Sequence, residues 1–483
     1  MRKVQGFING EYVSSGVYGD IFSPATGELI CQYDVTTPEQ VDQAVKAAED
    51  ALKGPWGKIS LQERVDILYK IADGIEARFE DFLEAECIDT GKPQSLARHI
   101  DIPRGAANFK VFADTIKNAA DEAFHTPTPD GTGALNYTVR KPKGVVGVIG
   151  PWNLPLLLMT WKVGPALACG NTVVVKPSEE TQLTTTLLGE VMNEAGVPKG
   201  VYNVVLGQGA VVGEALITNP GLDAITFTGS TKTGERIAAA AAKGIRDSSL
   251  ELGGKNAGIV FADCDMDKAI EGTLRSVFAN CGQVCIGTER LYVERSIFDE
   301  FVQRLKEGAE AFKLGASDDP ETNMGPLISA AHREKVLSYY KAAVDEGATV
   351  VTGGGIPEMS EELAGGYWVQ PTIWTGLPET AKVVQEEIFG PCTHIRPFDT
   401  EEEAIELAND TPYGLASSVW TENNSRAHRV AAQMDTGICW INSWFLRDLR
   451  TPFGGAKQSG TGREGGHYSL EFYSELTNIC VKL

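Results

Sequence analysis

The chain has 483 residues, of which 42% are hydrophobic and 22% charged, so it is long enough for about two or three folded domains and is not disordered. It carries 43 Lys and Arg against 65 Asp and Glu, a net charge of −22, which makes nucleic acid and acidic membrane surfaces poor partners. The nine cysteines contain no Cys-x-x-Cys and the six histidines no zinc-binding spacing, so we expect neither a disulfide scaffold nor a metal site.

The first residues, Met1 to Gly6, lead into polar sequence without the apolar stretch of a signal peptide. The longest apolar run, residues 154–161, is too short to span a bilayer. We therefore expect a cytoplasmic protein without a membrane segment. Two helices are predicted next, over residues 38–54 and 61–86, because apolar residues recur there at helical spacing.

Short runs of valine and isoleucine then alternate with helical patterns. The predicted strands are 144–149, 172–175, 201–206 and 224–227, and the predicted helices are 160–169, 181–195, 210–218 and 232–243. Uninterrupted β-branched strands that alternate with helices indicate parallel strands buried on both faces. This half of the chain is therefore predicted to be a doubly wound α/β domain.

The alternation starts again after residue 252 and predicts a second α/β domain over residues 252–440. Its strands are predicted at 257–261, 290–294, 348–352, 392–397 and 416–420, and its helices at 266–280, 296–313, 329–346, 400–408 and 423–434. Residues 135–141 and 477–483 are predicted to be lone strands, since neither has an obvious sheet partner in its own half of the chain. Such strands are typical of an arm that pairs with another subunit.

Residues 227–234, Phe-Thr-Gly-Ser-Thr-Lys-Thr-Gly, join a strand to a helix through Gly229 and Gly234. Free N–H groups at a helix N-terminus bind phosphate, and glycine lets the backbone approach it. The spacing is neither the Gly-x-Gly-x-x-Gly of dinucleotide-binding folds nor that of a nucleotide P-loop. A plain strand-to-helix turn is an equal alternative.

Lys176 and Glu179 follow a buried strand at its carboxyl end, where α/β sheets bind ligands. A carboxylate at this place can accept hydrogen bonds from both ribose hydroxyls of an adenosine and repels a 2′-phosphate, whereas a lysine has the opposite preference. Glu179 therefore favours NAD over NADP. The alternative is a helix capped by Ser178, with Glu179 near the helix dipole.

Three further segments carry groups suited to acyl chemistry. Cys281 and Cys285, in the run Asn280-Cys-Gly-Gln-Val-Cys, are candidate nucleophiles, although a lone cysteine is more often a small buried hydrophobe and the spacing could place both on one helical face. Glu251 lies between two leucines, a setting that raises the pKa of a carboxyl group toward that of a general base. Asn153, in a proline-bounded turn, offers an amide donor to an oxyanion or has only the structural role common for asparagine in turns.

Together with Glu387 in the run Glu-Glu-Ile-Phe-Gly-Pro (386–391), these segments in this order resemble the NAD(P)-dependent aldehyde dehydrogenase superfamily over nearly the whole chain. The resemblance implies an α/β fold with a Rossmann-type doubly wound NAD-binding domain, an α/β catalytic domain and a small β oligomerisation arm. It implies that Cys285 is the nucleophile, with Cys281 at a variable position. Glu251 matches the general base and Asn153 the side-chain oxyanion donor.

The resemblance also implies NAD as the cofactor and a set of residues around it. Lys176 and Glu179 match the residues at the adenosine ribose, and Glu387 matches the carboxylate on the nicotinamide ribose. The other expected cofactor-binding residues are Gly229, Ser230 and Gly234 in the turn beside the pyrophosphate, and Pro151, Trp152, Gly209, Phe227, Leu252 and Phe389.

By the same resemblance the chain divides into four parts. The NAD-binding domain is expected over residues 1–122 and 143–251, the catalytic domain over 252–440, and the oligomerisation arm over 123–142 and 470–483. Residues 441–469 are expected to form the substrate-funnel loop and the return to the NAD-binding domain. A homodimer or homotetramer is implied.

Two segments expected to line the aldehyde pocket contain arginine: Arg104 follows residues 99–103, and Arg447 and Arg450 lie in residues 444–450. These arginines either pair with nearby acids, as Arg450 with Asp448, or form a clamp of Arg104 and Arg447 for a carboxylate at the far end of the substrate. Both segments look like those of the 2-aminomuconate and 2-hydroxymuconate semialdehyde dehydrogenases. The implied substrate is a short unsaturated semialdehyde from tryptophan or catechol breakdown.

Several alternatives remain beside this hypothesis. The aldehyde could instead be betaine aldehyde or a simple aliphatic or aromatic aldehyde. An acyl-phosphate reductase that uses NADPH is a rival enzyme class, against which Glu179 and Glu251 argue. The intact set of Cys285, Glu251 and Asn153 argues against a role without catalysis, and Glu251 favours hydrolysis over acyl transfer to coenzyme A.

Overall fold

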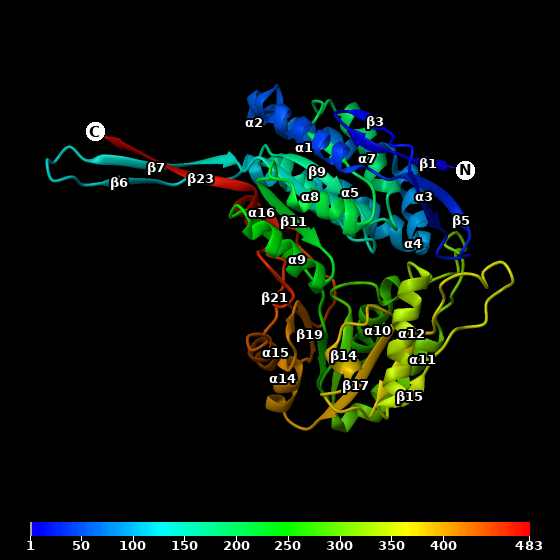
Figure 1. Ribbon diagram of the computed structural model, residues 1–483. Helices are drawn as coiled ribbons and strands as arrows, with labels where there is room; N and C mark the ends of the chain where they lie inside the picture. Colours follow the sequence, from blue (N-terminus) through cyan, green and yellow to red (C-terminus); the bar gives the residue numbers. More distant parts are fainter. Residues whose placement is uncertain (1) are drawn as a thin grey trace.

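A computed structural model describes residues 2–483. Figure 1 shows two α/β units, one above the other, and a long β arm that projects from the upper unit. The upper unit is built on an eight-stranded sheet with the order β22-β12-β11-β8-β9-β10-β2-β3. The lower unit is built on a seven-stranded sheet with the order β15-β16-β17-β14-β13-β19-β20.

The centre of the upper sheet is parallel and buried, as predicted. Its parallel strands are β8 (Val145–Ile149), β9 (Thr172–Lys176), β10 (Tyr202–Val204), β11 (Ala224–Thr228) and β12 (Asp247–Glu251). Every residue of β8, β9, β10 and β11 is buried, because helices cover both faces of the sheet. Antiparallel strands complete both ends: β2 (Gly6–Ile8) and β3 (Glu11–Val13) at one, β22 (Gly460–Thr461) at the other.

Alternate side chains of each central strand enter different cores. Val146 and Val148 of β8 belong to the core beneath one layer of helices, and Val145 and Ile149 belong to the core beneath the other. The first layer contains α2 (Leu61–Ala77), α3 (Phe79–Thr90), α5 (Ile102–Lys117), α6 (Pro155–Ala168) and α7 (Leu183–Glu194). The second contains α1 (Pro38–Lys53), α8 (Glu214–Thr218) and α9 (Thr231–Ala242).

The structure corrects three local predictions in this unit. The helix predicted over 61–86 is two helices, because the backbone at Arg78 (φ −107°, ψ 30°) leaves helical geometry. The helix predicted over 210–218 begins with a π-helical turn, Gly209–Gly213, before α8. Ser178 caps no helix: α7 begins at Leu183, and the Ser178 hydroxyl accepts a hydrogen bond from the Glu180 N–H instead (3.3 Å).

The lower sheet is also parallel, apart from β15 at one end. Its strands are β13 (Asn256–Val260), β14 (Thr288–Glu294), β15 (Thr349–Thr352), β16 (Thr372–Thr375), β17 (Cys392–Phe398), β19 (Ala416–Trp420) and β20 (Ile438–Ile441). One face is covered by α10 (Met266–Phe278), α11 (Phe298–Glu310) and α12 (Ala330–Asp345). The other face is covered by α14 (Glu401–Asn409) and α15 (Asn424–Ala431).

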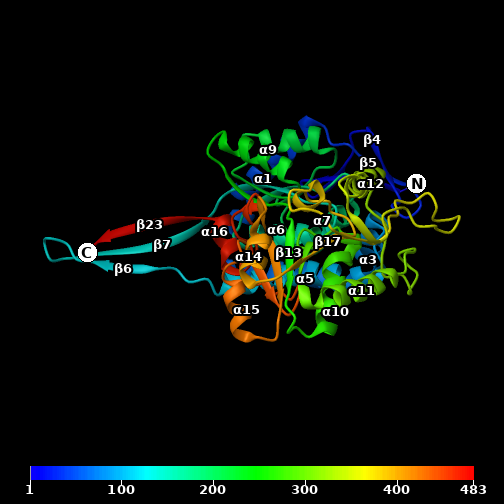
Figure 2. The ribbon, with the colours of Figure 1, turned by 90° about the horizontal axis from the view of Figure 1, so that it is seen from below.

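The arm is a three-stranded antiparallel sheet of β6 (Ala123–Thr126), β7 (Ala134–Pro142) and β23 (Ser474–Lys482). The two strands predicted to lack partners pair with each other, from Ser474 opposite Pro142 to Lys482 opposite Ala134. Figures 1 and 2 show that the arm projects well away from the rest of the protein. It begins later than predicted, because residues 470–473 complete α16 (Gly466–Tyr473), whose Leu470 and Tyr473 are buried in the first core.

Candidate active site

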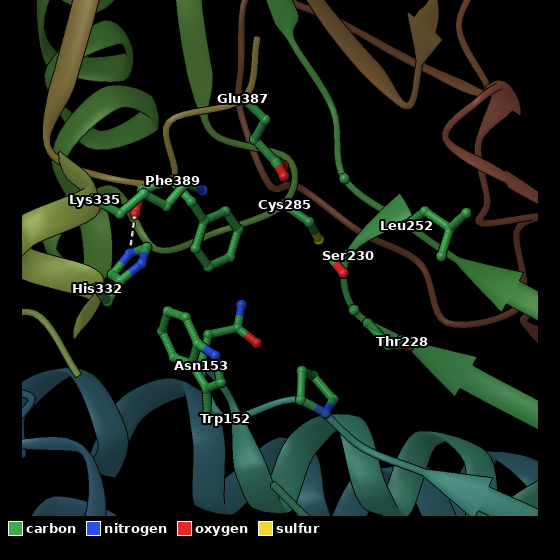
Figure 3. Close-up of a pocket in the computed structure, with 13 residues that line it drawn as sticks. Trp152, Asn153, Thr228, Ser230, Leu252, Cys285, His332, Lys335, Glu387 and Phe389 are labelled. Carbon is green, nitrogen blue, oxygen red and sulfur yellow. Dashed lines mark hydrogen bonds between the residues drawn. The ribbon is translucent and has the colours of Figure 1, made fainter. Parts of the chain in front are cut away.

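The carboxyl ends of the parallel strands in the upper sheet open toward the lower unit, and a cavity lies there. Figure 3 shows its lining, with Asn153 and Cys285 entering from different walls. The predicted residues that line it are Pro151, Trp152, Asn153, Gly229, Ser230, Leu252, Cys285, Glu387 and Phe389. Thr228, Gly253, His332 and Lys335 line it too, although the sequence did not single them out. The cavity thus combines residues of both α/β units.

A left-handed turn sets the course of the chain before Cys285. Asn280, Cys281 and Gly282 have φ values of 52°, 56° and 69° in succession. A Cβ atom on Gly282 would lie 2.0 Å from the carbonyl oxygen of Gly390, so only glycine fits this position. The turn also removes the possibility that Cys281 and Cys285 share one helical face.

Side-chain amides fix the chain on both sides of the cysteine. Gln283 accepts a hydrogen bond from the Ile328 N–H at Oε1 (3.0 Å) and donates from Nε2 to the carbonyl of Asn280 (3.1 Å). After the turn, Asn256 Nδ2 donates to the carbonyl oxygen of Cys285 at 2.7 Å. These contacts give Gln283 and Asn256 a structural role in holding the loop that carries Cys285.

Of the two candidate cysteines, Cys285 lines the cavity, whereas Cys281 is buried in the core of the lower unit. Burial, together with the charges of Glu251 and Glu387, raises the pKa of the Cys285 thiol to about 12. The Ile286 N–H and the Arg447 guanidinium act in the opposite direction. The thiol is therefore protonated at neutral pH in this environment and needs a base.

Glu251, at the end of β12, is 4% exposed. Neither carboxylate oxygen has a hydrogen-bond partner among residues 2–483. Burial raises the pKa of this carboxyl group well above its usual range, and the neighbouring Glu464 adds to the rise, while Lys162 and Arg447 oppose it. Glu251 does not line the cavity, but it is close enough for its charge to raise the pKa of the Cys285 thiol. A buried carboxyl group without hydrogen bonds, near a thiol, has the properties of a general base.

Asn153 is tied to the cysteine loop by its side chain and by its main chain. Its Nδ2 donates to the carbonyl oxygen of Gln283 (2.9 Å), and its own carbonyl oxygen accepts from Asn280 Nδ2 (3.0 Å). The amide therefore has a fixed place beside Cys285 and a second N–H available toward the cavity. This arrangement supports the oxyanion role over a turn function alone.

Glu387, Phe389 and His332 come from the lower unit and face Trp152, which follows β8 of the upper unit. Glu387 accepts a hydrogen bond from the Gly254 N–H (2.8 Å), and a Cβ atom on Gly253 would lie 2.2 Å from its carboxylate. The Trp152 ring meets the rings of Phe389 and His332 edge to face, at 5.4 and 5.1 Å between centroids. His332 Nε2 lies 2.8 Å from the carbonyl oxygen of Phe389 (Figure 3).

The residues expected at the adenosine lie on the same sheet edge but outside the cavity. Lys176 is buried and pairs with the half-exposed Glu179 at 3.5 Å. Its carbonyl oxygen accepts from the Gly150 N–H (3.0 Å), so the ends of β8 and β9 are neighbours. The turn that begins at Gly209 packs on this lysine, because a Cβ atom on Gly213 would lie 3.6 Å from Lys176 Cδ.

Phe227 and Gly234 lie behind the cavity wall rather than in it. A Cβ atom on Gly229 would lie 2.3 Å from the Phe227 ring, and one on Gly234 would lie 2.6 Å from Leu252 Cδ2. Gly234 thus lets α9 pack closely on the end of β12. Ser230 caps α9 by accepting a hydrogen bond from the Thr233 N–H (3.3 Å). The Gly-x-x-x-x-Gly segment consequently has two functions. It lets α9 pack closely on β12, and it presents the N-terminus of α9 to the cavity.

These features together fit a dinucleotide. An acid and a lysine lie at one end, a helix N-terminus with Gly229 in the middle, and a buried carboxylate with flat aromatic rings at the other. In the part of the chain from residue 2 onward, no cluster of three or more metal-binding side chains is arranged for a metal ion. None of the helices in this range is long and apolar enough to cross a membrane.

Arg104 on α5 and Arg447 on the 442–450 loop converge beside this site. The Arg447 guanidinium lies between the rings of Trp161 and Phe453, at 4.3 and 4.0 Å, and that of Arg104 lies 6.0 Å from the Trp161 ring. Burial lowers the pKa of Arg447 to about 9, and the charge of Arg104 contributes. The two cations are thus close enough to influence each other, and each is partly shielded from water.

Neither guanidinium forms an ion pair with an acid of the described chain, and Nε and Nη2 of both are buried without a hydrogen-bond partner there. Arg450, by contrast, is exposed and pairs with Asp448 at 2.6 Å, as the pairing alternative predicts. A second, mainly apolar cavity lies between residues 93–101, just before α5, and residues 444–445. Its walls include Leu154 and Val284, which are next to Asn153 and Cys285 in the chain. Neither Arg104 nor Arg447 lines this cavity or the first one.

Comparison with known proteins shows to which family the chain belongs. The model of the aldehyde dehydrogenase family matches residues 13–479. The chain belongs to this family. It is 71% identical to a 2-hydroxymuconic semialdehyde dehydrogenase of Pseudomonas sp. strain CF600, with all of both chains covered. It is 54% identical to a 2-aminomuconic 6-semialdehyde dehydrogenase of Pseudomonas sp., covering 100% of this chain and 99% of that one.

Solved structures agree with the assignment of the fold. An aldehyde dehydrogenase from Bacillus cereus, solved in complex with NAD+, superimposes with a TM-score of 0.96 at 40% identity, covering 100% of this chain and 97% of that chain. The predicted family, fold class, enzyme class and NAD cofactor are thereby confirmed for this aldehyde dehydrogenase.

Proposed function

We propose that this aldehyde dehydrogenase oxidises a semialdehyde that carries a carboxylate, 2-hydroxymuconic or 2-aminomuconic semialdehyde, to the dicarboxylic acid. The observation that carries the proposal is the pair Arg104 and Arg447, whose buried guanidinium nitrogens lack partners beside Cys285. Relatives named for these two substrates are 71% and 54% identical over the full length. The hydroxy compound is the first choice because the more similar relative is named for it.

Two partly buried cations close to each other are unfavourable unless an anion offsets them. Each guanidinium presents a fork of N–H donors that suits a carboxylate. The rings of Trp161 and Phe453 hold the Arg447 fork in place, which reduces the entropy lost on binding. Betaine aldehyde carries a quaternary ammonium group, so this pair of cations would repel it, and a simple aliphatic aldehyde would leave the pair unsatisfied.

The chemistry begins at Cys285. Its sulfur forms a bond to the aldehyde carbon, and the carbonyl oxygen becomes an oxyanion that accepts hydrogen bonds from Asn153 Nδ2 and from the Cys285 N–H. Glu251 is the nearby base for the thiol proton. Asn153 needs no rearrangement for this role, because Gln283 and Asn280 already hold it.

The chemistry that bound NAD would supply is the acceptance of a hydride from the carbon attached to Cys285. The proposed residues that hold NAD are Lys176 and Glu179 at the adenosine ribose and Glu387 at the nicotinamide ribose. Trp152 and Phe389 exclude water from the nicotinamide end, since their rings meet edge to face across the cavity wall.

Release of the acid requires water and a base. The acyl group remains on Cys285 as a thioester. Once the proton taken from the thiol has passed from Glu251 to solvent, Glu251 removes a proton from the water that attacks the thioester. The raised pKa of Glu251 suits this step, because a more basic carboxylate abstracts the proton more readily. The thiolate leaves, and the second carboxylate of the product forms.

The test is NAD reduction, followed as NADH absorbance, with 2-hydroxymuconic semialdehyde and with hexanal, an aldehyde that lacks the carboxylate. We expect kcat/KM for the muconic substrate to exceed that for hexanal by at least about a hundredfold, the range expected for two charge-assisted contacts. Equal values for both aldehydes would refute the carboxylate proposal while leaving the family assignment intact.

We propose the four-part division of the chain given above as the functional one, with the arm starting at Ser474 on the C-terminal side. Exposed apolar residues of the arm, Phe124, Leu476 and Val481, support pairing with a second subunit and therefore a homodimer or homotetramer. A cytoplasmic location is proposed as well, supported by the low cysteine content, 9 in 483 residues, and by the lack of a disulfide-type spacing among them.

A further inference from the structure

Three buried charged side chains lie directly behind Asn153. Lys92 is 2% exposed, and Glu86 and Asp101 are fully buried. Lys92 Nζ lies 2.6 Å from Asp101 Oδ2 and 3.2 Å from Glu86 Oε1. The mechanism above uses none of these three side chains, so it does not explain why three charged groups are buried here.

Lys92 makes one further contact, and it goes to the active site. Its Nζ donates to the carbonyl oxygen of Asn153 at 3.0 Å. Glu86 Oε2 accepts from the Leu156 N–H, at 3.3 Å, in the first turn of α6. The cluster therefore holds the main chain at Asn153 and just after it, where the proline-bounded turn ends and α6 begins.

The carbonyl of Asn153 receives donors from two directions. Asn280 Nδ2 reaches it from the cysteine loop and Lys92 Nζ from the opposite α/β unit, each at 3.0 Å. Two donors on one carbonyl fix the rotation of its peptide plane, and with it the direction in which the Cα–Cβ bond of Asn153 leaves the chain. The two hydrogen bonds to the main chain thereby fix the orientation of the side-chain amide that faces Cys285.

We propose that Lys92, held by Glu86 and Asp101, is a positioning residue for the oxyanion-binding amide of Asn153; the inference rests on the proposed function, which gives that amide its role. An oxyanion donor acts only if it is already in place when charge develops. A displacement of about 1 Å at a reacting centre can cost about a hundredfold in rate.

The competing explanation is that the cluster of Lys92, Glu86 and Asp101 only stabilises the fold. Burying three charges is weak support for stability, because the desolvation cost can exceed the attraction between them. Stability would also be served by a partner anywhere in the core, whereas Lys92 directs its remaining N–H to the residue that faces the nucleophile. The two explanations differ in whether the effect of Lys92 passes through Asn153.

The experiment is a double-mutant cycle between Lys92 and Asn153 in the full chain, with NAD and 2-hydroxymuconic semialdehyde. Lys92→Met alone leaves two uncompensated buried carboxyl groups and can fail to fold, so the main variant is Lys92→Met with Glu86→Gln and Asp101→Asn. This variant keeps the shape of the cluster and removes its charges together. Steady-state kcat and KM and the pre-steady-state rate of NADH formation are measured.

We expect the triple variant to lower kcat and the rate of NADH formation by at least about tenfold, with both KM values within about threefold of the parent. Asn153→Ala should lower kcat by more, about a hundredfold. Adding the triple substitution to Asn153→Ala should lower it no further. Equal losses in both backgrounds, or a loss seen in KM alone, would overturn the positioning role.

Failure of the Lys92 inference can be distinguished from failure of the proposed function. If Asn153→Ala leaves kcat and the rate of NADH formation unchanged, the oxyanion assignment itself is wrong and the inference about Lys92 falls with it. Arg290→Met is the matched control for lost stability, since Arg290 is a buried cation that donates to the carbonyls of Leu407 and Ala408. Arg290→Met should lower the melting temperature without a specific fall in kcat. A fall in kcat equal to that of the triple variant would mean that Lys92 only stabilises the fold.

Discussion

Replacing Arg447 by methionine tests the carboxylate clamp most directly. Methionine fills the space between Trp161 and Phe453 without the charge, so packing changes little. A charge-assisted hydrogen bond contributes about 1.5–3 kcal/mol, which corresponds to a rise in KM for the muconic semialdehyde of about 10- to 150-fold. Arg104→Met should act in the same direction, and somewhat less because Asp101 already offsets part of its charge.

The assay is the initial rate of NADH formation as a function of aldehyde concentration, repeated with hexanal and with Arg450→Met. Arg450 lies in the same loop but is exposed and paired with Asp448, so its loss should change neither KM. A rise in KM for both aldehydes alike, or no rise with Arg447→Met, would refute the reasoning.

Arg447→Met should also move the pH profile. Arg447 lowers the pKa of Glu251 and of Cys285. Its removal therefore raises both pKa values, and the limb of the kcat/KM profile that rises with pH should shift to higher pH. A shift to lower pH would contradict the electrostatic assignment.

Two other substitutions give distinct outcomes. Glu251→Gln removes the base for both the thiol proton and thioester hydrolysis, so kcat should fall by about 100- to 10,000-fold; an unchanged kcat would argue against both roles. Gly282→Ala places a Cβ atom 2.0 Å from the Gly390 carbonyl in a left-handed turn, so thermal unfolding should show a loss of about 1–3 kcal/mol, whereas an unchanged melting temperature would mean that the turn is not required.

The central sheet could be predicted because strands buried on both faces are continuous apolar runs in the sequence. Strands such as Val145–Ile149 are continuous apolar runs, and every residue of them is buried. Short strands such as Thr372–Thr375 and Ile438–Ile441 were missed, since a four-residue strand is defined by its neighbours and not by its composition. The arm strands lacked an evident partner because their pairing joins segments more than 330 residues apart.

The choice between Cys281 and Cys285 could not be made from local sequence. Both are small, both follow a helix, and their spacing is compatible with one helical face. The left-handed turn at Asn280–Gly282 separates them, and it depends on the approach of Gly390 from another loop. His332 and Lys335 were missed for a similar reason: a spacing of three on α12 places them on one face, but only the packing of the two units turns that face toward the cavity.

The net charge of −22 opposes the approach of a carboxylated substrate over the whole surface, so capture depends on charges within about 8 Å, the distance over which salt does not screen them. The sequence could name Arg104 and Arg447 for this role, but it could not show whether 65 acids leave them unpaired. In the structure both guanidinium groups lie against aromatic rings, and neither forms an ion pair with an acid among residues 2–483. Glu251 and Glu464 are near enough to influence the charge of Arg447 without neutralising it through a hydrogen bond. A bound carboxylate would thus complete a site that is otherwise electrostatically unbalanced, which is the property expected of a determinant of substrate specificity.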